Sequence, residues 1–321
     1  MTAPTLPTIE RPATFNVYLK LSLVAITWGG TFVAGRYLAG HLNPMVSASL
    51  RFMLASAALT IFLLLSGRGF VRLSAIQLAR VVFLGFCGIF AYSVFFFRGL
   101  QEVSAARASL IVALNPAAMA VVSYLFYRER LSLLKSVGIA LCFAGVALVV
   151  SGGDPNTLLA SPTAARSWTG ELLIFGCVLS WTAYSVFCKG IVQQVGPLHT
   201  VAYSVYAGTL MLTAFTALSG GFNLHDIRAL PLPGWLGLAY LGLLGSAITY
   251  IWYYDAIQQI GATRSGVFIA LNPFAAVLLG ALLLGETLTV STLLGGTVIV
   301  AGIIACNRPP ASTCRASAGK C

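Results

Sequence analysis

Long apolar runs alternate with short polar connections along this chain of 321 residues. A helix needs about 20 apolar residues to cross the hydrocarbon core of a bilayer. With that length as a ruler, and with glycine, proline and charged residues as boundaries, the pattern predicts an all-α integral membrane protein. Its ten expected spans are residues 17–38, 44–66, 76–98, 104–126, 132–151, 169–190, 197–218, 233–256, 262–284 and 289–306.

Three polar segments lie outside these spans. Residues 1–16 predict a disordered start, residues 152–168 a linker in the middle of the chain, and residues 307–321 a disordered tail. The first apolar run is too long and too far from the N-terminus for a cleaved signal peptide. We therefore interpret it as the first spanning helix.

The chain is an internal duplication. The motif Ala-Leu-Asn-Pro occurs at residues 113–116 and again at 270–273, and the same offset of 157 aligns Gln101 with Gln258 and Glu129 with Glu286. Nearer the start of each copy an offset of 153 aligns three further pairs, which are Trp28 with Trp181, Pro44 with Pro197, and Arg51 with Ser204. We call residues aligned by these offsets repeat mates. The copies are residues 17–151 and 169–306.

Each copy carries five predicted spans. Because five is odd, the second copy crosses the membrane in the opposite sense, and the repeat is inverted. Inverted repeats of this kind hold their functional site between the two copies. We therefore expect the site there.

The composition supports a membrane protein. Hydrophobic residues make up 58% of the chain, charged residues 8%, and the mean hydropathy is +0.90, whereas roughly a quarter of a soluble domain is charged. The net charge of +11 does not indicate a nucleic-acid partner, because the charges lie in the short connections. None of the seven cysteines has CxxC or zinc-finger spacing. We expect no cofactor and no bound metal.

The lysines and arginines predict the orientation. With a cytoplasmic N-terminus, 13 of the 19 lie inside: Arg11, Lys20, Arg68, Arg72, Arg80, Arg128, Arg130, Lys135, Lys189, Arg264, Arg308, Arg315 and Lys320. Arg51 lies within the second span, and five lie outside: Arg36, Arg98, Arg107, Arg166 and Arg228. Since cytoplasmic loops carry the excess of positive residues, both termini are expected in the cytoplasm and the linker 152–168 outside it.

Three stretches of the first copy resemble a known family: TWGGTFVAGRYL, NPMVSASLRF and ALNPAAMAVVSYLFYRERLSLLKSVGIALCFAGV. They resemble EamA-type members of the drug/metabolite transporter superfamily. The second-copy stretch ALNPFAAVLLGALLLGETLTVSTLLGGTVIVAG fits more closely, with Gly285-Glu286 where the first copy has Arg128-Glu129. The resemblance covers nearly all of the chain except the tails. Among better-understood relatives the chain is similar to YddG-like amino-acid exporters, at family level only.

This resemblance implies ten helices in two inverted repeats around a central cavity, with alternating access in a bacterial inner membrane. It also implies export of amino acids, related metabolites or drugs. The central cavity, the alternating access and the exported substrates are expectations that come from the family alone.

The two Asn-Pro pairs lie inside the fourth and ninth expected spans. Pro116 and Pro273 each remove a backbone hydrogen bond and are expected to kink their helices. Such broken backbone is tolerated where it is buried in protein or lines a wet cavity. Asn115 and Asn272 are therefore candidate ligands of a polar substrate. The alternative is that each asparagine only satisfies its own kinked backbone or a neighbouring helix.

Aromatic residues recur near the middle of several spans. Trp28 and Trp181 lie too deep for the interfacial belt that tryptophans usually occupy. Thr31 and Tyr184, also repeat mates, lie one helical turn further along. These four are candidates for a substrate cavity together with Tyr92, Phe96, Tyr203, Thr249 and Tyr253. Plain packing is the alternative for each of them.

Arg51 lies about seven residues into the second span. An unpaired arginine in hydrocarbon costs about 2.5–3.5 kcal/mol on insertion scales, so its side chain must pair, face water or snorkel. It could hold a substrate carboxylate or lock a gate. Snorkelling to the outer headgroups is the alternative.

The remaining charges suggest gates rather than proton relays. Arg98 and Asp255 are repeat mates near opposite membrane faces and are candidate gate residues. Glu129 and Glu286 fall in connections and are expected to be structural. None of the eight acids lies at mid-membrane, which argues against proton antiport driven by a carboxylate. Facilitated diffusion or exchange is the simpler mechanism.

Small residues fill the fifth and tenth spans: Gly138, Ala140, Ala144, Gly145, Gly295, Gly296, Ala301 and Gly302. They allow close backbone packing, so we interpret both spans as scaffold. They also offer a dimer surface, and the chain is expected to be a monomer or a weak homodimer through these two spans.

We therefore predict a transporter, not an enzyme, that moves a small molecule across the lipid bilayer. Export of amino acids or related metabolites is the first hypothesis, and drug efflux or metabolite import and exchange are the alternatives. A membrane-embedded enzyme acting on lipid-linked substrates is a rival from another class. It lacks support, because His41, His199 and His225 lie in or beside connections and no HExxH motif occurs.

Overall fold

The computed structural model describes residues 12–67, 69–127, 133–151, 168–260, 268 and 271–307, and every regular element within them is helical. Eight helical segments are long and apolar enough to cross a membrane: Asn16–Ala39, Pro44–Leu65, Ala75–Glu102, Ala105–Phe126, Leu133–Ser151, Thr169–Phe187, Pro197–Leu218 and Leu232–Ala256. Two apolar helices are shorter, Asn272–Leu284 and Val290–Cys306. The all-helical class is confirmed, and a count of ten spans stays a prediction.

The outward faces of these helices are apolar. Leu125, Leu210, Leu278 and Leu282 are each more than half exposed. Large exposed apolar surface is uncommon on proteins that face water. It fits a surface that contacts lipid.

The first and sixth spans differ from the sequence prediction. Helix α1 (Pro12–Ala39) begins before residue 17, so residues 12–16 are helical rather than disordered. Proline suits the first turn of a helix, since its missing N–H has no partner there in any case. The predicted span 169–190 is interrupted at Cys188, where α9 (Thr169–Phe187) gives way to α10 (Lys189–Val195).

The third and eighth spans are longer than predicted, and each contains a π-helical segment. The third consists of α3 (Ala75–Gly85), η1 (Phe86–Ala91) and α4 (Tyr92–Glu102). The eighth consists of α13 (Leu232–Ala239), η2 (Tyr240–Ile248) and α14 (Thr249–Ile260). The repeat offset superimposes η1 on the second part of η2. Because π-helical turns occur frequently at functional sites, this shared irregularity points to the same region of both copies.

The fourth span is broken where the sequence predicts a kink. Helix α5 (Ala105–Val112) ends before Ala113 and Leu114, and α6 (Asn115–Tyr127) begins at the asparagine of the repeated motif. In the second copy α16 (Asn272–Leu284) also begins at its asparagine. Most of residues 262–271 lie outside the described part of the chain.

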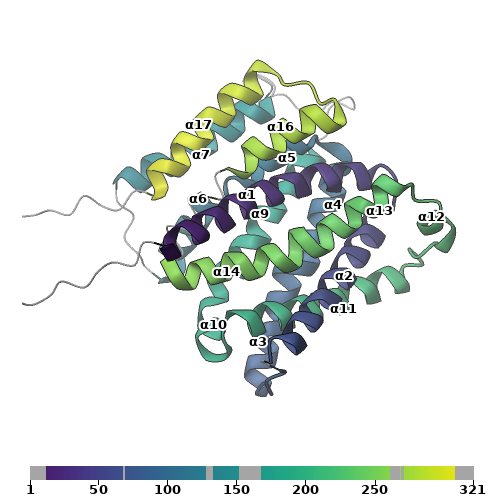
Figure 1. The fold of residues 1–321 in the computed structure, drawn as a ribbon. Helices are drawn as coiled ribbons and strands as arrows, with labels where there is room; N and C mark the ends of the chain where they lie inside the picture. The colour runs from purple at the N-terminus through teal and green to yellow at the C-terminus, as the bar shows by residue number, and fades with distance from the viewer. Residues whose placement is uncertain are drawn as a thin grey trace, which may run out of the picture.

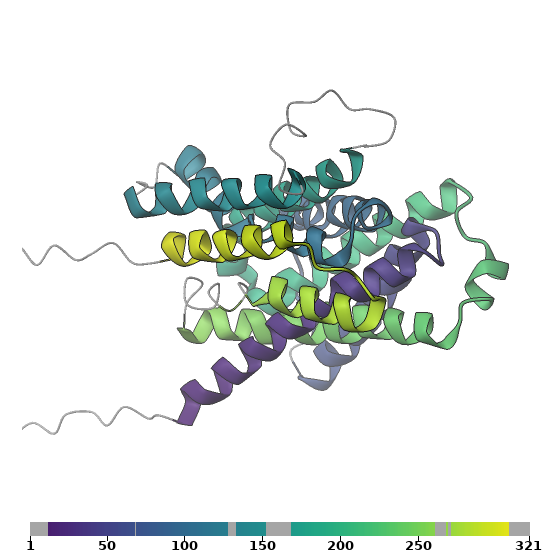
Figure 2. The same cartoon turned by 90° about the horizontal axis from the view of Figure 1, so that it is seen from above.

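The first span of each copy packs mainly against the other copy. Helix α1 packs against α13, η2, α14 and α16, and α9 packs against η1, α4, α5 and α6. Helix α2 (Pro44–Leu65) lies along α11 (Pro197–Leu218) at one end of the molecule, and α7 (Leu133–Ser151) lies along α17 (Val290–Asn307) at the other (Figure 1). Seen from above, α17 and α7 lie apart from the short α12 (Leu224–Arg228) (Figure 2).

Glycines bring α7 and α17 together. A Cβ atom on Gly138 would lie 2.7 Å from the carbonyl oxygen of Gly302, and one on Gly145 would lie 2.7 Å from that of Gly295. These positions therefore admit no side chain without a shift of backbone. The glycines that suggested a dimer surface are used for a contact within the chain, which supports the scaffold role, and the dimer remains a prediction.

Three pairs of repeat mates touch each other. The rings of Trp28 and Trp181 lie 6.2 Å apart between centroids, and the Oγ of Ser56 lies 2.9 Å from the Oγ1 of Thr209. The third pair is Cys142, whose thiol donates to the carbonyl of Ile299 at 3.7 Å. A residue meets its own repeat mate only where both lie on the axis that relates the copies. The pseudo-two-fold axis therefore passes through the α2–α11 contact, the two tryptophans and the α7–α17 contact.

Candidate functional site

Six aromatic rings gather around the contact of Trp28 with Trp181 on the pseudo-two-fold axis. We call them the aromatic cluster: Trp28, Tyr92, Trp181, Tyr184, Tyr250 and Tyr253. The ring of Trp28 lies 5.9 Å from that of Tyr250 and 5.1 Å from that of Tyr253. The ring of Trp181 lies 5.9 Å from Tyr92, 5.4 Å from Tyr184 and 5.9 Å from Tyr250. These separations are those of favourable edge and offset contacts. Both tryptophans are partly buried.

The two tryptophans use their indole N–H groups differently. The Nε1 of Trp28 donates to the carbonyl of Gly245 at 3.1 Å and to the Oγ1 of Thr249 at 2.9 Å. The repeat mate of Thr249 is Tyr92, so Trp181 has no equivalent hydroxyl. Among the described residues the Nε1 of Trp181 has no acceptor.

Thr31 and Tyr184 occupy the same slot in the two copies. A Cβ atom on Gly245 would lie 2.7 Å from the Cγ2 of Thr31, and one on Gly88 would lie 2.3 Å from the ring of Tyr184. The Thr31 hydroxyl donates to the carbonyl of Trp28 at 2.6 Å, and the Tyr184 hydroxyl lies 3.2 Å from the Oγ of Ser204. Both hydroxyls are therefore satisfied within the protein.

Arg51 is buried at the edge of the aromatic cluster, with 5% of its surface exposed. Its Nε donates to the Oγ of Ser246 at 2.9 Å. Its guanidinium carbon lies 4.9 Å from the ring centroid of Phe52 and 5.8 Å from that of Phe96. The burial argues against snorkelling to the headgroups.

The terminal nitrogens of Arg51 have no partner in the described part of the chain. No hydrogen-bond acceptor or carboxylate there lies within reach of Nη1 or Nη2. The guanidinium does lie close enough to Tyr92 and Tyr250 to interact with both electrostatically. The cation therefore borders the aromatic cluster with its charge unpaired.

Each Asn-Pro pair begins a helix that packs beside a tryptophan. Asn115 is 7% exposed, and its Oδ1 has no donor among the described residues. Helix α6, which it begins, packs on α9, the helix that carries Trp181. The carbonyl oxygen of Asn272 lies 2.6 Å from a Cβ atom built on Gly29, next to Trp28. The Asn272 kink therefore lies beside the residue that follows Trp28, and the helix that Asn115 begins packs on the helix of Trp181.

Tyr203 uses its hydroxyl elsewhere. The hydroxyl donates to the carbonyl of Val71 at 2.7 Å and accepts from the Val71 amide at 2.8 Å. It thereby ties α11 to the segment before α3. This hydroxyl is not offered to the aromatic cluster.

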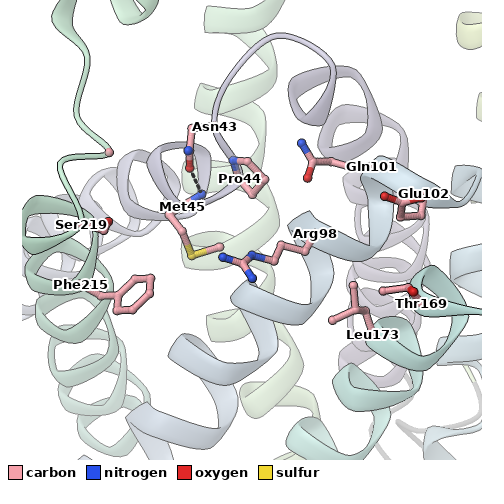
Figure 3. A pocket seen from close by; sticks show the side chains of 11 residues that line it. Asn43, Pro44, Met45, Arg98, Gln101, Glu102, Thr169, Leu173, Phe215 and Ser219 are labelled. Carbon is pink, nitrogen blue, oxygen red and sulfur yellow. Dashed lines mark hydrogen bonds between the residues drawn. The ribbon is translucent and has the colours of Figure 1, made fainter.

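The two candidate gate residues lie apart and have different surroundings. The carboxylate of Asp255 on α14 pairs with the Nζ of Lys20 on α1 at 3.3 Å. Arg98 extends from α4 into a cavity of about 700 Å³ (Figure 3). The cavity is lined by Asn43, Pro44, Met45, Arg98, Gln101, Glu102, Thr169, Leu173, Phe215, Ser219 and Gly221.

Glu286 caps a helix of the other copy. Its two carboxylate oxygens accept from the backbone amides of Ala105 at 2.8 Å and Ala106 at 3.1 Å, at the start of α5. A carboxylate is favourable at a helix N-terminus, where amides lack partners. This is a structural role, as the sequence predicts. Its repeat mate Glu129 lies outside the described residues.

Sequence reasoning missed Ser246 and Tyr250. Their repeat mates are Ile89 and Ser93, so neither belongs to a matched pair of aromatic or charged residues. The spacing of Ser246, Thr249, Tyr250 and Tyr253 follows one face of a helix. That spacing was the available signal. Within the described residues no group of three or more His, Cys, Asp or Glu side chains is placed to hold a metal ion.

Comparison with known proteins gives consistent matches over almost the whole chain. The sequence profile of the EamA-like transporter family matches residues 16–151 and 168–308. The chain is 26% identical over 292 residues to the uncharacterized transporter YyaM of Bacillus subtilis (strain 168), covering 90% of this chain and 92% of that one.

Two further matches bear on relatives and on the fold. The chain is 28% identical over 290 residues to a probable terminal-alkyne amino-acid exporter of Streptantibioticus cattleyicolor, covering 90% of this chain and 92% of that one. A crystal structure with 20% sequence identity superimposes with a TM-score of 0.62 and covers 91% of this chain and 98% of that chain. At this identity the crystal structure supports the fold alone.

Proposed function

We propose that this chain, which belongs to the EamA-like transporter family, exports amino acids or related small metabolites by alternating access. Membership rests on the family match to both halves of the chain. It makes the protein a multi-pass membrane transporter. The substrate, the direction of transport and the mechanism are our proposal, as are the bacterial inner membrane and the cytoplasmic location of both termini.

The observation that carries the proposal is the aromatic cluster on the pseudo-two-fold axis. The axis that relates two inverted repeats lies in the plane of the membrane, so a site on it is equally far from the two membrane faces. A rocking motion of the copies can therefore expose the site to either face in turn. Its rings suit the flat or amphipathic side chains of amino acids. The unpaired N–H of Trp181 and the Oδ1 of Asn115 supply polar contacts.

Two alternatives have less support. The first is drug efflux, and the unpaired charge of Arg51 disfavours cationic drugs. An enzyme acting on lipid-linked substrates would need a cluster of acids and histidines within the membrane. Amino-acid export is favoured further because one relative carries that function in its name.

The positions of the acidic residues are consistent with transport that is not coupled to protons. Asp255 pairs with Lys20, and Glu171 pairs with Arg107 at 3.3 Å. Glu286 caps α5. Glu102 lines the cavity that Arg98 enters. None of these carboxylates reaches the aromatic cluster, so we propose facilitated diffusion or exchange.

The test is uptake of a panel of labelled amino acids by liposomes that contain the purified protein, with and without a pH gradient. We expect uptake of apolar or aromatic amino acids that does not depend on the gradient. Trp28→Ala and Asn272→Ala should lower it without loss of membrane insertion, whereas Trp235→Ala, on the exposed surface, should not. No uptake of any amino acid by the wild type would refute the substrate class.

A further inference from the structure

We propose that Arg51 binds the carboxylate of the transported molecule and thereby restricts transport to compounds with one carboxylate next to an apolar or aromatic group. The inference rests on the proposed function and adds the residue that sets its substrate class. It starts from a buried cation whose terminal nitrogens have no partner in the described part of the chain.

A buried guanidinium needs compensation. Breaking or omitting the partner of a buried charge is strongly unfavourable, and charged residues within membrane spans usually pair or face water. Arg51 has one hydrogen bond, to a neutral hydroxyl, and two aromatic neighbours. These contacts orient the charge but do not neutralise it. The negative charge of a bound substrate would neutralise the guanidinium.

The hydrogen bond of the Arg51 Nε to Ser246 leaves the two terminal nitrogens of the guanidinium for a ligand. Ser246 holds the Nε of Arg51, and its own hydroxyl donates to the carbonyl of Leu241 at 2.9 Å. The unused Nη1 and Nη2 form the fork that binds a carboxylate through two parallel hydrogen bonds. Helix α2 reaches this position because residue 242 is glycine. A Cβ atom there would lie 2.8 Å from the carbonyl oxygen of Arg51.

The charge occurs in only one copy of the repeat. The repeat mate of Arg51 is Ser204, whose hydroxyl lies 3.2 Å from that of Tyr184. The site therefore offers one carboxylate position rather than two. A monocarboxylate leaves it neutral, whereas a second carboxylate finds no cation in the described part of the aromatic cluster.

The aromatic cluster can accept the ammonium group of the same molecule. Ammonium groups bind over tryptophan and tyrosine rings, and no described carboxylate competes for the position. A cation without a carboxylate gains these contacts but also meets the charge of Arg51. The arrangement favours zwitterions over simple amines.

The experiment compares phenylalanine with phenylalaninamide and phenethylamine, which lack the carboxylate, in proteoliposomes containing wild type, Arg51→Gln, Arg51→Lys or Ser204→Ala. For the wild type we expect phenylalanine transport and roughly 10- to 100-fold less transport of both analogues, the loss for one or two charge-assisted hydrogen bonds. Arg51→Gln should remove the preference. Arg51→Lys should restore part of it, and Ser204→Ala should retain it.

The outcomes separate this inference from the proposed function. Equal transport of phenylalanine and phenylalaninamide by the wild type overturns the role of Arg51 even if Arg51→Gln does not fold. A preference that persists in folded Arg51→Gln overturns it as well. If the wild type moves phenylpyruvate but no amino acid, and Arg51→Gln does not, the role of Arg51 stands and amino-acid export fails.

Discussion

The two copies of the repeat share their backbone contacts and differ in their chemistry. A Cβ atom on Gly242 would lie 2.8 Å from the carbonyl oxygen of Arg51, and one on Gly85 would lie 2.7 Å from that of its repeat mate Ser204. In each copy a glycine of the third helix of that copy lets the second helix of the other copy approach closely. The contact sets the helix spacing on each side of the axis.

The side chains at these positions have diverged. One copy combines Arg51 with Ser246 and Tyr250, and the equivalent positions of the other are Ser204, Ile89 and Ser93. At these positions the glycine–backbone contact occurs in both copies, whereas the charged and hydroxyl side chains that can bind a ligand occur in one. A symmetric scaffold thus carries a polar, one-sided site.

The largest effect is expected at the shared glycines. Gly242→Ala and Gly85→Ala should each destabilise the protein by about 1–3 kcal/mol, because the new methyl group overpacks a contact with backbone. Thermal unfolding in detergent measures the effect. Gly190→Ala is the control, since its nearest neighbour lies 4.0 Å from the new atom. A large loss at only one of the two shared glycines would contradict the equivalence of the contacts.

The tryptophans should respond differently to loss of the indole N–H. Trp28→Phe should reduce stability by about 0.5–1.5 kcal/mol, because its hydrogen bonds lie within the protein. Trp181→Phe should leave the unfolding temperature nearly unchanged and weaken substrate binding instead. Unfolding curves and binding titrations of both variants distinguish these results. Equal changes of stability and of binding in the two variants would contradict the proposed difference between the tryptophans.

The helix cap formed by Glu286 joins the copies at one end of the molecule. Glu286→Ala should cost about 0.5–2 kcal/mol, the usual effect of losing a cap. Glu102→Ala, in the cavity that Arg98 enters, is the matched control. Thermal unfolding checks the pair, and equal stability of both variants would show that the cap contributes nothing.

The smallest effect is expected for the Lys20–Asp255 pair. Both side chains are well exposed, at 40% and 39%, and exposed ion pairs contribute about 0–1 kcal/mol. A double-mutant cycle with Lys20→Ala and Asp255→Ala measures the coupling, which should also fall in high salt. A coupling free energy well above this range would contradict the expectation of a weak surface ion pair and would support a role of the pair as a gate.

The length of the apolar runs and the repeated motif sufficed to predict an all-helical membrane protein. The contact between Trp28 and Trp181 could be anticipated because they are repeat mates deep in their spans. Sequence reasoning left Arg51 undecided between snorkelling and pairing, because the choice depends on how far η2 approaches α2. The sequence did not predict that the first span of each copy packs mainly against the other copy, and it did not predict the π-helical segments. Both features depend on side-chain packing, which leaves no periodic pattern in the sequence.

Reasoning from matched pairs also concealed part of the site. It favoured Thr31 and Tyr184, whose hydroxyls are satisfied within the protein, and passed over Ser246 and Tyr250, whose repeat mates are chemically different. Agreement between copies points to the paired tryptophans, whereas differences between copies point to the polar residues around Arg51.

The most direct test of the one-sided site is calorimetric titration of phenylalanine into purified wild type, Arg51→Gln and Ser204→Ala, with folding verified for each. We predict roughly a tenfold or greater loss of affinity for Arg51→Gln, the consequence of losing a charge-assisted hydrogen bond, and little change for Ser204→Ala. Equal affinities of wild type and Arg51→Gln, or equal losses in both variants, would contradict the account.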